Sequence, residues 1–361
     1  MEETTIGEAF NLKSGKQLSK NKMIPGEHPV FGGNGISGYH NEYMFKNPKI
    51  VIGRVGAYCG NVQRTKPFSW ITDNALYIDE KLHQYDDSYL EYLLRSLDLK
   101  KYSSQSGQPL ISQGRISKVK IPLPTLSEQK TIVAKLGRAQ RLIDIDREML
   151  SKYHELIQSV FLEMFGDVEG EKVSLSELVK LNPRKSEISH IDKTIEASFL
   201  GMAEVGENGS LNLSEVQTIE ESWKGYTYFK ENDVLFAKIT PCMENGKGAI
   251  AKGLRNGIGF GSTEFHVLRP IEGVSRSAWI YHLTHSDKFR KIAESFMTGS
   301  AGQKRVPTHF FDRFKVVKPT IEKQIQFEEI AKKISTDKKQ LRSQIKESED
   351  LFSSLVHGVF Y

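Results

Sequence analysis

The stretch that decides the fold is residues 132–164, IVAKLGRAQRLIDIDREMLSKYHELIQSVFLEM. Its seam positions are spaced alternately four and three residues apart, which is the heptad pattern of a coiled-coil helix. They are Ile132, Leu136, Ala139, Ile143, Asp146, Leu150, Tyr153, Ile157, Val160 and Met164. At about 1.5 Å per residue, this seam predicts a helix roughly 50 Å long.

The same register returns 195 residues later without a gap. The second seam consists of Phe327, Ala331, Ile334, Lys338, Leu341, Ile345, Ser348, Phe352, Leu355 and Val359. Other pairs share this offset: Gly107-Gln108 with Gly302-Gln303, Pro124 with Pro319, and Gln129 with Gln324. The chain is therefore predicted to be a duplicated unit, in which each globular part is followed by a long helix.

The predicted organisation has four segments. Residues 1–125 form a first globular domain, 126–168 a first helix, 169–320 a second globular domain and 321–361 a second helix. The globular parts mix strands with short helices, which gives an α+β fold class. Residues 48–53 and 75–78 have strand composition, residues 32–38 indicate a flexible loop or tight turn, and residues 88–99 indicate an amphipathic helix.

The boundaries of the first long helix follow from local signals. The prolines at 122 and 124 interrupt any preceding element, and Ser127 is the expected N-cap, with Glu128 in the first turn. Gly166-Asp167 is the expected stop.

A helix of this length with an apolar seam needs a partner. We expect the two helices of the chain to pair with each other, antiparallel and related by a pseudo-two-fold axis, as a coiled-coil spacer. Two alternatives are that each helix packs on its own globular part, or that two chains dimerise. The charged seam positions Asp146 and Lys338 either set the register, contact another subunit or extend to solvent.

Composition narrows the class of protein. A chain of 361 residues with 38% hydrophobic and 26% charged residues is typical of a multidomain globular protein. No apolar run reaches the roughly 20 residues of a membrane span, and the acidic N-terminus lacks the apolar core of a signal peptide. Cys59 and Cys242 have no metal-ligand spacing, so we expect reduced thiols and a cytoplasmic location.

The positive charge gathers at equivalent places in the two units. The net charge is +5, and the first basic stretch contains Lys100, Lys101, Arg115, Lys118 and Lys120 without an acidic residue. The matching stretch contains Lys304, Arg305, Arg313, Lys315 and Lys318 against Asp312. This repetition indicates a polyanionic partner, although a solvated basic face is the simpler interpretation of either stretch alone.

Motifs for catalysis are missing. The sequence has no phosphate-binding Gly-x-x-x-x-Gly-Lys-Ser/Thr loop and no His-x-x-x-His or Cys-x-x-Cys spacing. Asn47-Pro48 and Asn182-Pro183 lack the second proline and the aromatic residue that methyltransferases of DNA bases use. The sequence therefore favours a non-catalytic chain without a metal of its own.

Polar residues suited to DNA recognition recur at matching places. Asn and Gln side chains bind adenine, Arg and Lys bind guanine or phosphates, and glycine permits close approach. The first candidate set is Arg54, Asn61, Gln105, Gln108 and Arg115; the second is Lys238, Thr240, Lys247, Gln303, Lys304 and Arg305. A helical spacer holding two domains about 40–50 Å apart suits a DNA site with two halves, since B-DNA repeats about every 34–36 Å.

The chain resembles the specificity subunits of type I restriction-modification enzymes over essentially its whole length. The stretches that carry this resemblance are residues 120–130 (KIPLPTLSEQK), 164–167 (MFGD), 233–241 (DVLFAKITP) and 261–270 (GSTEFHVLRP). The order of globular part, helix, globular part, helix is also shared. One departure is the second repeat, where KPTIEKQ at 318–324 replaces the fuller motif of the first.

The resemblance implies a function for each part. Each globular domain would be a target recognition domain that binds one half of a bipartite site on double-stranded DNA. The helices would set the gap between the halves and dock two modification subunits, with restriction subunits as possible further partners. The implied reaction is adenine methylation, with S-adenosylmethionine and ATP with Mg²⁺ bound by the partner subunits and no cofactor bound by this chain.

Three other functions remain open from the sequence. An enzyme with unrecognised motifs would modify or cut DNA by itself. A two-headed protein-binding scaffold would lack salt-dependent DNA affinity. A specificity protein that has lost its partners would share every feature above.

Overall fold

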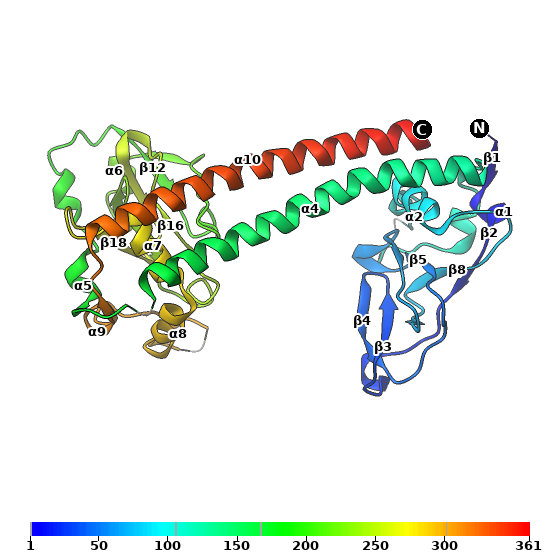
Figure 1. The fold of residues 1–361 in the computed structure, drawn as a ribbon, viewed down its shortest axis with the longest axis horizontal. Helices are drawn as coiled ribbons and strands as arrows, with labels where there is room; N and C mark the ends of the chain where they lie inside the picture. Colours follow the sequence, from blue (N-terminus) through cyan, green and yellow to red (C-terminus); the bar gives the residue numbers. More distant parts are fainter. Residues whose placement is uncertain (1, 105–106, 167, 301) are drawn as a thin grey trace. The chain divides into compact units, whose positions relative to one another are not determined.

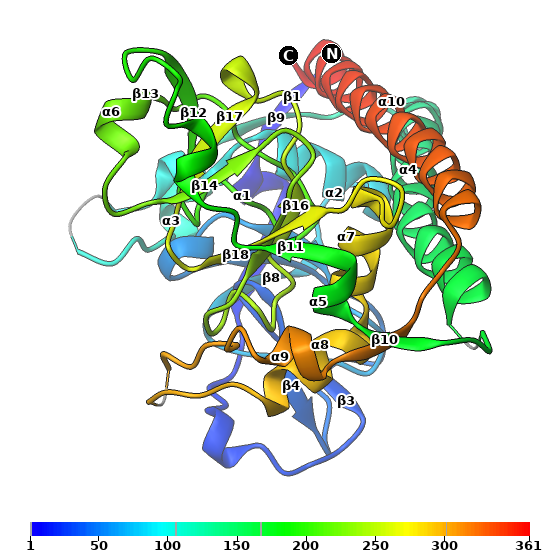
Figure 2. The same ribbon diagram turned by 90° about the vertical axis from the view of Figure 1, so that its left-hand side faces the viewer.

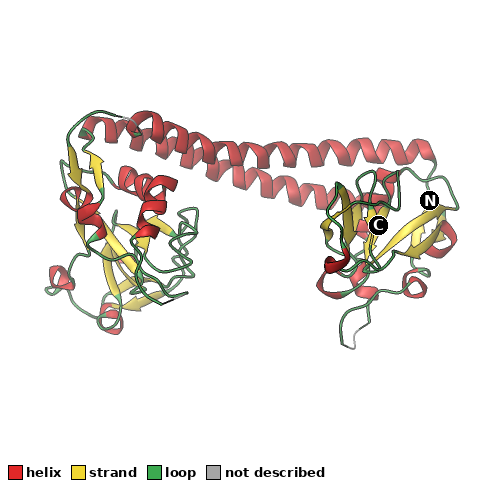
Figure 3. Ribbon diagram, turned by 90° about the horizontal axis from the view of Figure 1, so that it is seen from below, coloured by secondary structure: helices red, strands yellow, loops and turns green. Residues whose placement is uncertain are grey.

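The computed structural model describes residues 2–104, 107–166, 168–300 and 302–361. The chain forms two compact units, and Figure 1 follows it through both by colour. Unit 1 comprises Met1–Arg147 with Ser343–Tyr361, and unit 2 comprises Glu148–Arg342. Both units contain strands as well as helices (Figure 3), which confirms the α+β class. We call the globular part of unit 1, residues 2–122, head 1, and that of unit 2, residues 172–317, head 2.

Head 1 is built on an antiparallel four-stranded sheet of order β2-β8-β5-β6, beside a three-stranded sheet β4-β3-β7 and a β1-β9 pair. Its strands are β1 (Glu3–Thr5), β2 (Phe10–Ser14), β3 (His28–Gly32), β4 (Gly35–His40), β5 (Ile50–Gly53), β6 (Val62–Arg64), β7 (Trp70–Ile71), β8 (Ala75–Lys81) and β9 (Lys120–Pro122). Its helices are α1 (Ile6–Ala9), α2 (Asp87–Ser96) and α3 (Gln113–Ile116), with 3₁₀ turns η1 (Lys20–Lys22), η2 (Gly56–Tyr58) and η3 (Leu99–Tyr102).

Head 2 repeats this plan with a four-stranded sheet β11-β18-β15-β16, a β10-β19 pair and a second sheet β13-β12-β17-β14. The β13-β12-β17 part matches β4-β3-β7 of head 1, since each middle strand pairs antiparallel with one neighbour and parallel with the other. Its strands are β10 (Lys172–Ser174), β11 (Val179–Leu181), β12 (Glu196–Leu200), β13 (Val216–Thr218), β14 (Thr227–Lys230), β15 (Val234–Ala237), β16 (Gly248–Ile250), β17 (Ile258–Gly261), β18 (Phe265–Pro270) and β19 (Lys315–Val317). Its helices are α5 (Leu175–Leu178), α6 (Ile219–Ser222), α7 (Ser277–His285), α8 (Asp287–Ser295) and α9 (Phe310–Arg313), with η4 (Lys185–Ile188) and η5 (Arg255–Gly257). Helix α7 packs against β15, β16 and β18. Figure 2 labels α7 together with β16 and β18.

Local sequence explains the shared elements. The central strands β5 and β15 are buried at all four positions, so their apolar residues face other protein on both sides. The short helices α1 and α5 each begin with a capping box, formed by Thr5 with Glu8 and by Ser174 with Glu177. In α2, Asp86 is the N-cap, and its carboxylate accepts hydrogen bonds from two backbone N–H groups of the first turn.

The long helices are α4 (Leu126–Phe165) and α10 (Ile321–Phe360), and each contributes to both units. In unit 1, Ile132 near the start of α4 and Phe360 at the end of α10 pack on the same core of head 1. In unit 2, Phe161 near the end of α4 lies 5.3 Å, ring centre to ring centre, from Phe327 near the start of α10. The start of one helix thus meets the end of the other in each unit, which confirms the antiparallel pairing; both helices also pack on the heads.

The start of α4 differs from the prediction. Thr125, not Ser127, is the N-cap: its backbone N–H donates to the Glu128 carboxylate at 2.8 Å, and its hydroxyl oxygen accepts from the Glu128 N–H at 3.4 Å. Ser127 lies inside the first turn, where its carbonyl accepts from Thr131. The capping box Thr-x-x-Glu was therefore present in the sequence one residue before the predicted helix. Residues 32–38, predicted as a loop or tight turn, form the turn of the β3–β4 hairpin and much of β4.

The seam is protected from solvent along both helices. Seven of the predicted docking and coiled-coil positions are buried: Leu136, Ile143, Ile157, Phe327, Ile334, Leu341 and Ile345. Ile132, Leu150 and Phe352 are half-buried, and so are the charged seam positions Asp146 and Lys338.

Candidate nucleic-acid interface

The candidate DNA contacts in the two heads are placed by the same backbone hydrogen bonds. In head 1, Arg54 follows β5; its N–H donates to the Asn74 carbonyl and its carbonyl accepts from the Ile111 N–H, both at 2.9 Å. In head 2, Lys238 follows β15 and makes the matching bonds with Glu264 and Val306, also at 2.9 Å. The two basic residues thus occupy equivalent positions at the end of the central strand.

Two more matching bonds bring the other loops to this point. The Gly53 N–H donates to Asn61 at 2.7 Å, and the Ala237 N–H donates to Lys247 at 3.2 Å. The Gly56 N–H donates to Pro109 at 2.9 Å, as the Thr240 N–H does to Lys304 at 3.0 Å. We call residues 54–61 with 107–111 the head-1 loop cluster. Residues 238–247 with 302–306 are the head-2 loop cluster.

In the head-1 loop cluster, Asn61 and Gln108 are exposed, whereas Arg54 is half-buried. The Arg54 guanidinium donates through Nη1 to Ser14 Oγ at 3.1 Å, while its Nε is buried without a partner among the described residues. Arg115 is exposed on α3, outside the cluster, and donates to the Ser103 carbonyl at 3.4 Å. Gln105, the remaining candidate of this head, lies outside the described residues.

In the head-2 loop cluster, several candidates hold the loops together. Both ends of the Arg305 guanidinium donate to Glu264, from Nε and Nη2 at 2.9 Å each. This interaction keeps the pKa of the Glu264 carboxyl below its ordinary value. Lys247 Nζ donates to the Met202 carbonyl at 3.0 Å, and the Thr240 hydroxyl donates to Glu244 at 3.0 Å.

The remaining head-2 candidates differ in exposure. Gln303 and Lys304 are exposed on the loop before β19, where side chains can reach a ligand. Lys238 is half-buried, and this burial lowers the pKa of its ammonium group. Each loop cluster therefore combines two exposed amide or basic residues with a half-buried cation behind them.

Two groups of candidate functional residues were not predicted from the sequence. Tyr58 on η2 is 53% exposed in the head-1 loop cluster, between Arg54 and Asn61, and its ring can contact a base or sugar. On α4, four apolar residues are exposed at spacings of 3, 4 and 7: Leu142, Ile145, Met149 and Leu156. This second heptad stripe was visible in the sequence beside the seam, and an exposed apolar stripe is typical of a protein-docking face.

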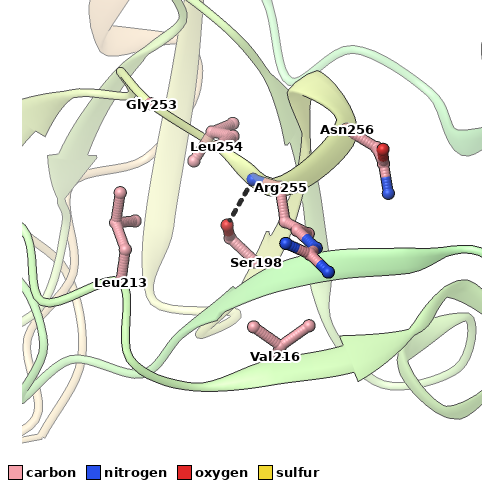
Figure 4. A pocket seen from close by; sticks show the side chains of 7 residues that line it. All are labelled: Ser198, Leu213, Val216, Gly253, Leu254, Arg255 and Asn256. Atoms are coloured by element: carbon pink, nitrogen blue, oxygen red, sulfur yellow. Dashed lines mark hydrogen bonds between the residues drawn. The ribbon is translucent and has the colours of Figure 1, made fainter.

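A further depression of about 500 Å³ in head 2 includes none of the candidate DNA contacts (Figure 4). Arg255 in its wall is paired with Glu196, Nη2 to Oε2 at 2.8 Å, and its backbone N–H donates to the Ser198 hydroxyl oxygen. Its cation is thus already neutralised, and we assign it no function.

The sequence matches the family of type I restriction modification DNA specificity domains over residues 1–152 and 167–348. The chain belongs to this family. The two matched segments correspond to the two head-and-helix repeats, so the specificity domain occurs twice in the chain.

Curated relatives of this specificity family come mostly from Escherichia coli. The EcoAI specificity subunit is 35% identical over 228 residues, which is 63% of this chain and 32% of that protein. The EcoEI specificity subunit is 41% identical over 150 residues, 41% of this chain and 25% of that protein. A putative type I specificity subunit of Mycoplasma pneumoniae is 31% identical over 169 residues, covering 42% of this chain and 44% of that protein. The matches with the first two relatives thus span about a third or less of those proteins.

Solved structures share the fold of this specificity chain. An S subunit of a type I restriction-modification system from M. genitalium aligns with a TM-score of 0.53 at 17% identity, covering 100% of this chain and 96% of that one. A chain from a structure on complex assembly and conformational transition of the type I R-M system aligns with a TM-score of 0.60 at 14% identity, covering 99% and 97%. At these identities the likeness concerns the fold alone.

Each head of the specificity chain is fastened to a long helix by one buried glutamine. Gln129 accepts from the Asp86 N–H at 2.8 Å and donates to the Gln84 and Pro124 carbonyls at 2.9 Å each. Gln324 accepts from the Arg276 N–H at 2.8 Å and donates to the Val274 and Pro319 carbonyls. We call these the glutamine clamps; they tie the loop before α2 or α7 to the first turn of α4 or α10.

Within residues 2–104, 107–166, 168–300 and 302–361, no three His, Cys, Asp or Glu side chains are grouped as metal ligands. No helix in those ranges combines the length and apolar character needed to cross a bilayer. Cys59 and Cys242 are free thiols, Cys59 being buried.

Proposed function

We propose that this chain is the DNA-reading specificity subunit of a type I restriction-modification system, in which each head recognises one half of a bipartite site. The observation that carries the proposal is the pair of loop clusters. Both place amide and basic side chains at the end of a central strand through the same set of backbone hydrogen bonds. Direct readout of bases needs such side chains on loops or helices that reach a groove.

Within each loop cluster we assign different roles to the exposed and the fixed residues. Asn61 and Gln108 of head 1, and Gln303 and Lys304 of head 2, are the proposed contacts with bases or phosphates. Arg54 and Lys238 stand behind them as positive charge for the phosphate backbone. Arg305 is tied to Glu264, so we propose that it shapes the head-2 loops.

We propose that the exposed stripe on α4 docks modification subunits. Leu142, at 61% exposure, and Ile145, Met149 and Leu156 leave apolar surface in water, which a partner helix with heptad spacing would cover. Two modification subunits, and restriction subunits in some assemblies, are the proposed protein partners.

The chain itself is proposed to be non-catalytic and to work in the cytoplasm, where it meets cellular DNA. S-adenosylmethionine, the methyl donor for adenine, and ATP with Mg²⁺ are proposed to bind to the partner subunits. The absence of phosphate-loop and metal-ligand motifs from the sequence supports this division of labour.

Mapping of adenine methylation by long-read sequencing tests the proposal. The host lacks its own adenine methylation and expresses a candidate modification subunit with or without this chain. A new methylated motif made of two short halves with a fixed gap, present only with the chain, is the expected result. Methylation or cleavage of DNA by the purified chain alone would instead indicate an enzyme, and a lack of salt-dependent DNA affinity in the assembled complex would indicate a scaffold.

A further inference from the structure

Unit 2 contains a cavity of about 850 Å³ between its parts of α4 and α10 and the helices α7 and α8. This volume falls within the range of about 300–1,000 Å³ that small-ligand sites occupy. Its walls come from these four helices, a loop at residues 207–210 and Asn245 of the head-2 loop cluster, all of which belong to unit 2. None of the candidate DNA contacts lines this cavity.

The internal repeat of the chain shows what is unusual about this cavity. In unit 1, Arg147 of α4 pairs with Glu349 of α10, next to the buried seam residue Ile143 and the acidic Asp144. A shift of 195 residues, the offset of the repeat, carries these positions onto the wall of the cavity in unit 2.

There the side chains are different. Arg342 stands in place of Arg147, but His154 replaces its partner Glu349. Lys338 replaces Ile143, and Lys339 replaces Asp144. One cation and two carboxylates in unit 1 have thus become three cations and a histidine in unit 2.

Three cations of the cavity lack an ion-pair partner among the described residues, although Glu207 and Asp287 place carboxylates on its wall. Lys338, Lys339 and Arg342 form no ion pair there, whereas Arg290 on the opposite wall pairs with Asp287. Burial, and then the neighbouring Arg342, lower the pKa of the half-buried Lys338 ammonium. A partly buried cation without a partner costs free energy, which a bound anion would offset.

The histidines of the cavity are not a further source of positive charge near neutral pH. Burial lowers the pKa of His282 to about 3 and that of His285 to about 4, so both rings are neutral near pH 7. Burial, and then Lys338, lower the pKa of His154 as well. A neutral imidazole ring has a single N–H, and that of His285 faces the Tyr281 carbonyl from Nδ1 at 2.8 Å, so its Nε2 offers no proton to an anion.

The remaining wall contains polar side chains, such as those of Gln158 and Ser335, together with apolar and aromatic ones. Ile157 and Phe161 of α4 and Ile334 of α10 are buried core residues that reach the cavity. Tyr281 of α7 lies beside them, with a ring centre 3.9 Å from that of His285. A ligand that fills this space therefore meets cations as well as apolar and aromatic side chains.

We propose that this cavity binds a small organic anion, a phosphate or carboxylate attached to an aromatic or apolar body. The anionic group contacts Lys338, Lys339 and Arg342, and the body packs against Phe161, Ile334 and Tyr281. The site exists in unit 2 and not at the repeat-related positions of unit 1, because those positions carry the Arg147–Glu349 ion pair and Ile143.

Isothermal titration of the full chain, in a buffer without phosphate, tests this proposal. The probes are adenosine 5′-monophosphate, phenyl phosphate and benzoate, with adenosine as the uncharged comparison. Millimolar or tighter binding of at least one of the anions, with no binding of adenosine, is expected.

Two variants restore the unit 1 residues at this site. His154→Glu supplies the carboxylate that Arg147 has in unit 1, and Lys338→Ile restores the apolar seam; each should weaken anion binding at least tenfold. Because each replaces an unfavourable arrangement, the Tm of the unliganded chain should hold or rise, which shows that weaker binding is not unfolding. Lys332→Ile is the matched control, since it removes an exposed lysine of α10 outside the cavity.

The proposal is overturned if none of the anions binds at millimolar concentration, or if adenosine binds as well as its monophosphate. It is equally overturned if folded His154→Glu and Lys338→Ile chains bind the anion with wild-type affinity.

Discussion

Arg269 of head 2 is almost fully buried, and two carboxylates share its guanidinium. Its Nε and Nη2 donate to the two oxygens of Asp233 at 2.7 Å each, and Nη1 donates to Glu187. The Asp233 side chain is only 1% exposed. A buried ion pair adds little net stability, but removing one partner leaves an uncompensated charge inside the protein.

Asp233→Ala is therefore expected to lower the free energy of unfolding by about 3–5 kcal/mol. Chemical denaturation of the purified chain, monitored by circular dichroism, measures this loss. The control is Glu196→Ala at the exposed Arg255 pair, which should cost less than about 1 kcal/mol. Equal losses in the two variants would contradict the account of the buried pair.

His266 connects the core of head 2 to its loop cluster. Its Nε2 lies 2.8 Å from the Val306 carbonyl, and its Nδ1 lies 3.2 Å from Asn182 Nδ2. Burial lowers the pKa of His266 from 6.5 to about 4, even though the Val306 carbonyl acts in the opposite direction. The ring is thus neutral in the folded protein over a pH range where the unfolded chain binds a proton.

This pKa shift predicts a pH dependence of stability. With the folded pKa depressed, the stabilisation is fully present above pH 6.5 and is lost as the pH falls toward 4, in total on the order of 3 kcal/mol. His282 and His285 act in the same direction. The Tm of the chain should therefore decline between pH 6.5 and 5, above the range where carboxylates titrate, and His266→Gln should decline less steeply. Parallel profiles for wild type and variant would rule out the assignment to His266.

For single residues, the type of side chain at the candidate site could be predicted from the sequence better than the residue with which that side chain interacts. The exposed Asn61, Gln108, Gln303 and Lys304 follow from polar loops at repeated positions. The pairing of Arg305 with Glu264 does not, because 41 residues separate the two in the chain. They meet because the backbone of Lys238 bonds to Glu264 on one side and to Val306 on the other.

Among the elements, α4 carries two apolar stripes with different environments. Ile143 in the seam is 2% exposed, whereas its neighbour Leu142 is 61% exposed. Of these two adjacent residues of similar size, Ile143 therefore belongs to the packing of the helix and Leu142 to its proposed docking surface.

Ile143→Ala is expected to cost about 2–5 kcal/mol of stability, because it leaves a cavity in the seam. Leu142→Glu should leave the Tm within about 2 °C, since an exposed substitution changes the free energy of unfolding little, but should reduce co-purification with the modification subunit. Thermal unfolding and pull-down of both variants provide the measurement. If Leu142→Glu unfolds the chain, or Ile143→Ala does not destabilise it, the two stripes have been assigned the wrong way round.

The glutamine clamps explain how a head is held on its helix. Gln324→Leu would leave the Arg276 N–H and the Val274 and Pro319 carbonyls without the side chain that bonds them. Each buried unsatisfied group costs about 1–3 kcal/mol, so a loss of several kcal/mol is expected on chemical denaturation. Gln140→Leu is the control, because the Gln140 side chain donates to Asp144 on the same helix, in an exposed hydrogen bond. Similar stability of the two variants would contradict the clamp.

The elements were predictable to different degrees. Heptad spacing is a local property, so both long helices and their seams could be read directly from the sequence. The strand order β2-β8-β5-β6 could not, because it depends on pairing between residues such as Leu12 and Ile78 that lie far apart in the chain. The same holds for the sheets β4-β3-β7 and β13-β12-β17-β14, because the parallel pairs β3–β7 and β12–β17 also join distant parts of the chain.

At the scale of the whole molecule, duplication gives two heads with one backbone plan and different side chains. Arg54 and Asn61 of head 1 stand where head 2 has Lys238 and Lys247. If such side chains read DNA, the two halves of the target should differ in sequence, and a change in one head should alter one half only. The two heads are therefore expected to recognise their halves of the DNA site independently of each other.

The most direct test maps the methylated motif of two double variants in the assembled complex. Asn61→Ala with Gln108→Ala changes head 1, Gln303→Ala with Lys304→Ala changes head 2, and the exposed Lys252→Ala serves as the control for lost charge. If the heads read DNA independently, each double variant relaxes one half of the motif, a different half for each, while the other half and the gap stay fixed. Relaxation of both halves by one variant, or an unchanged motif with both, would contradict this prediction.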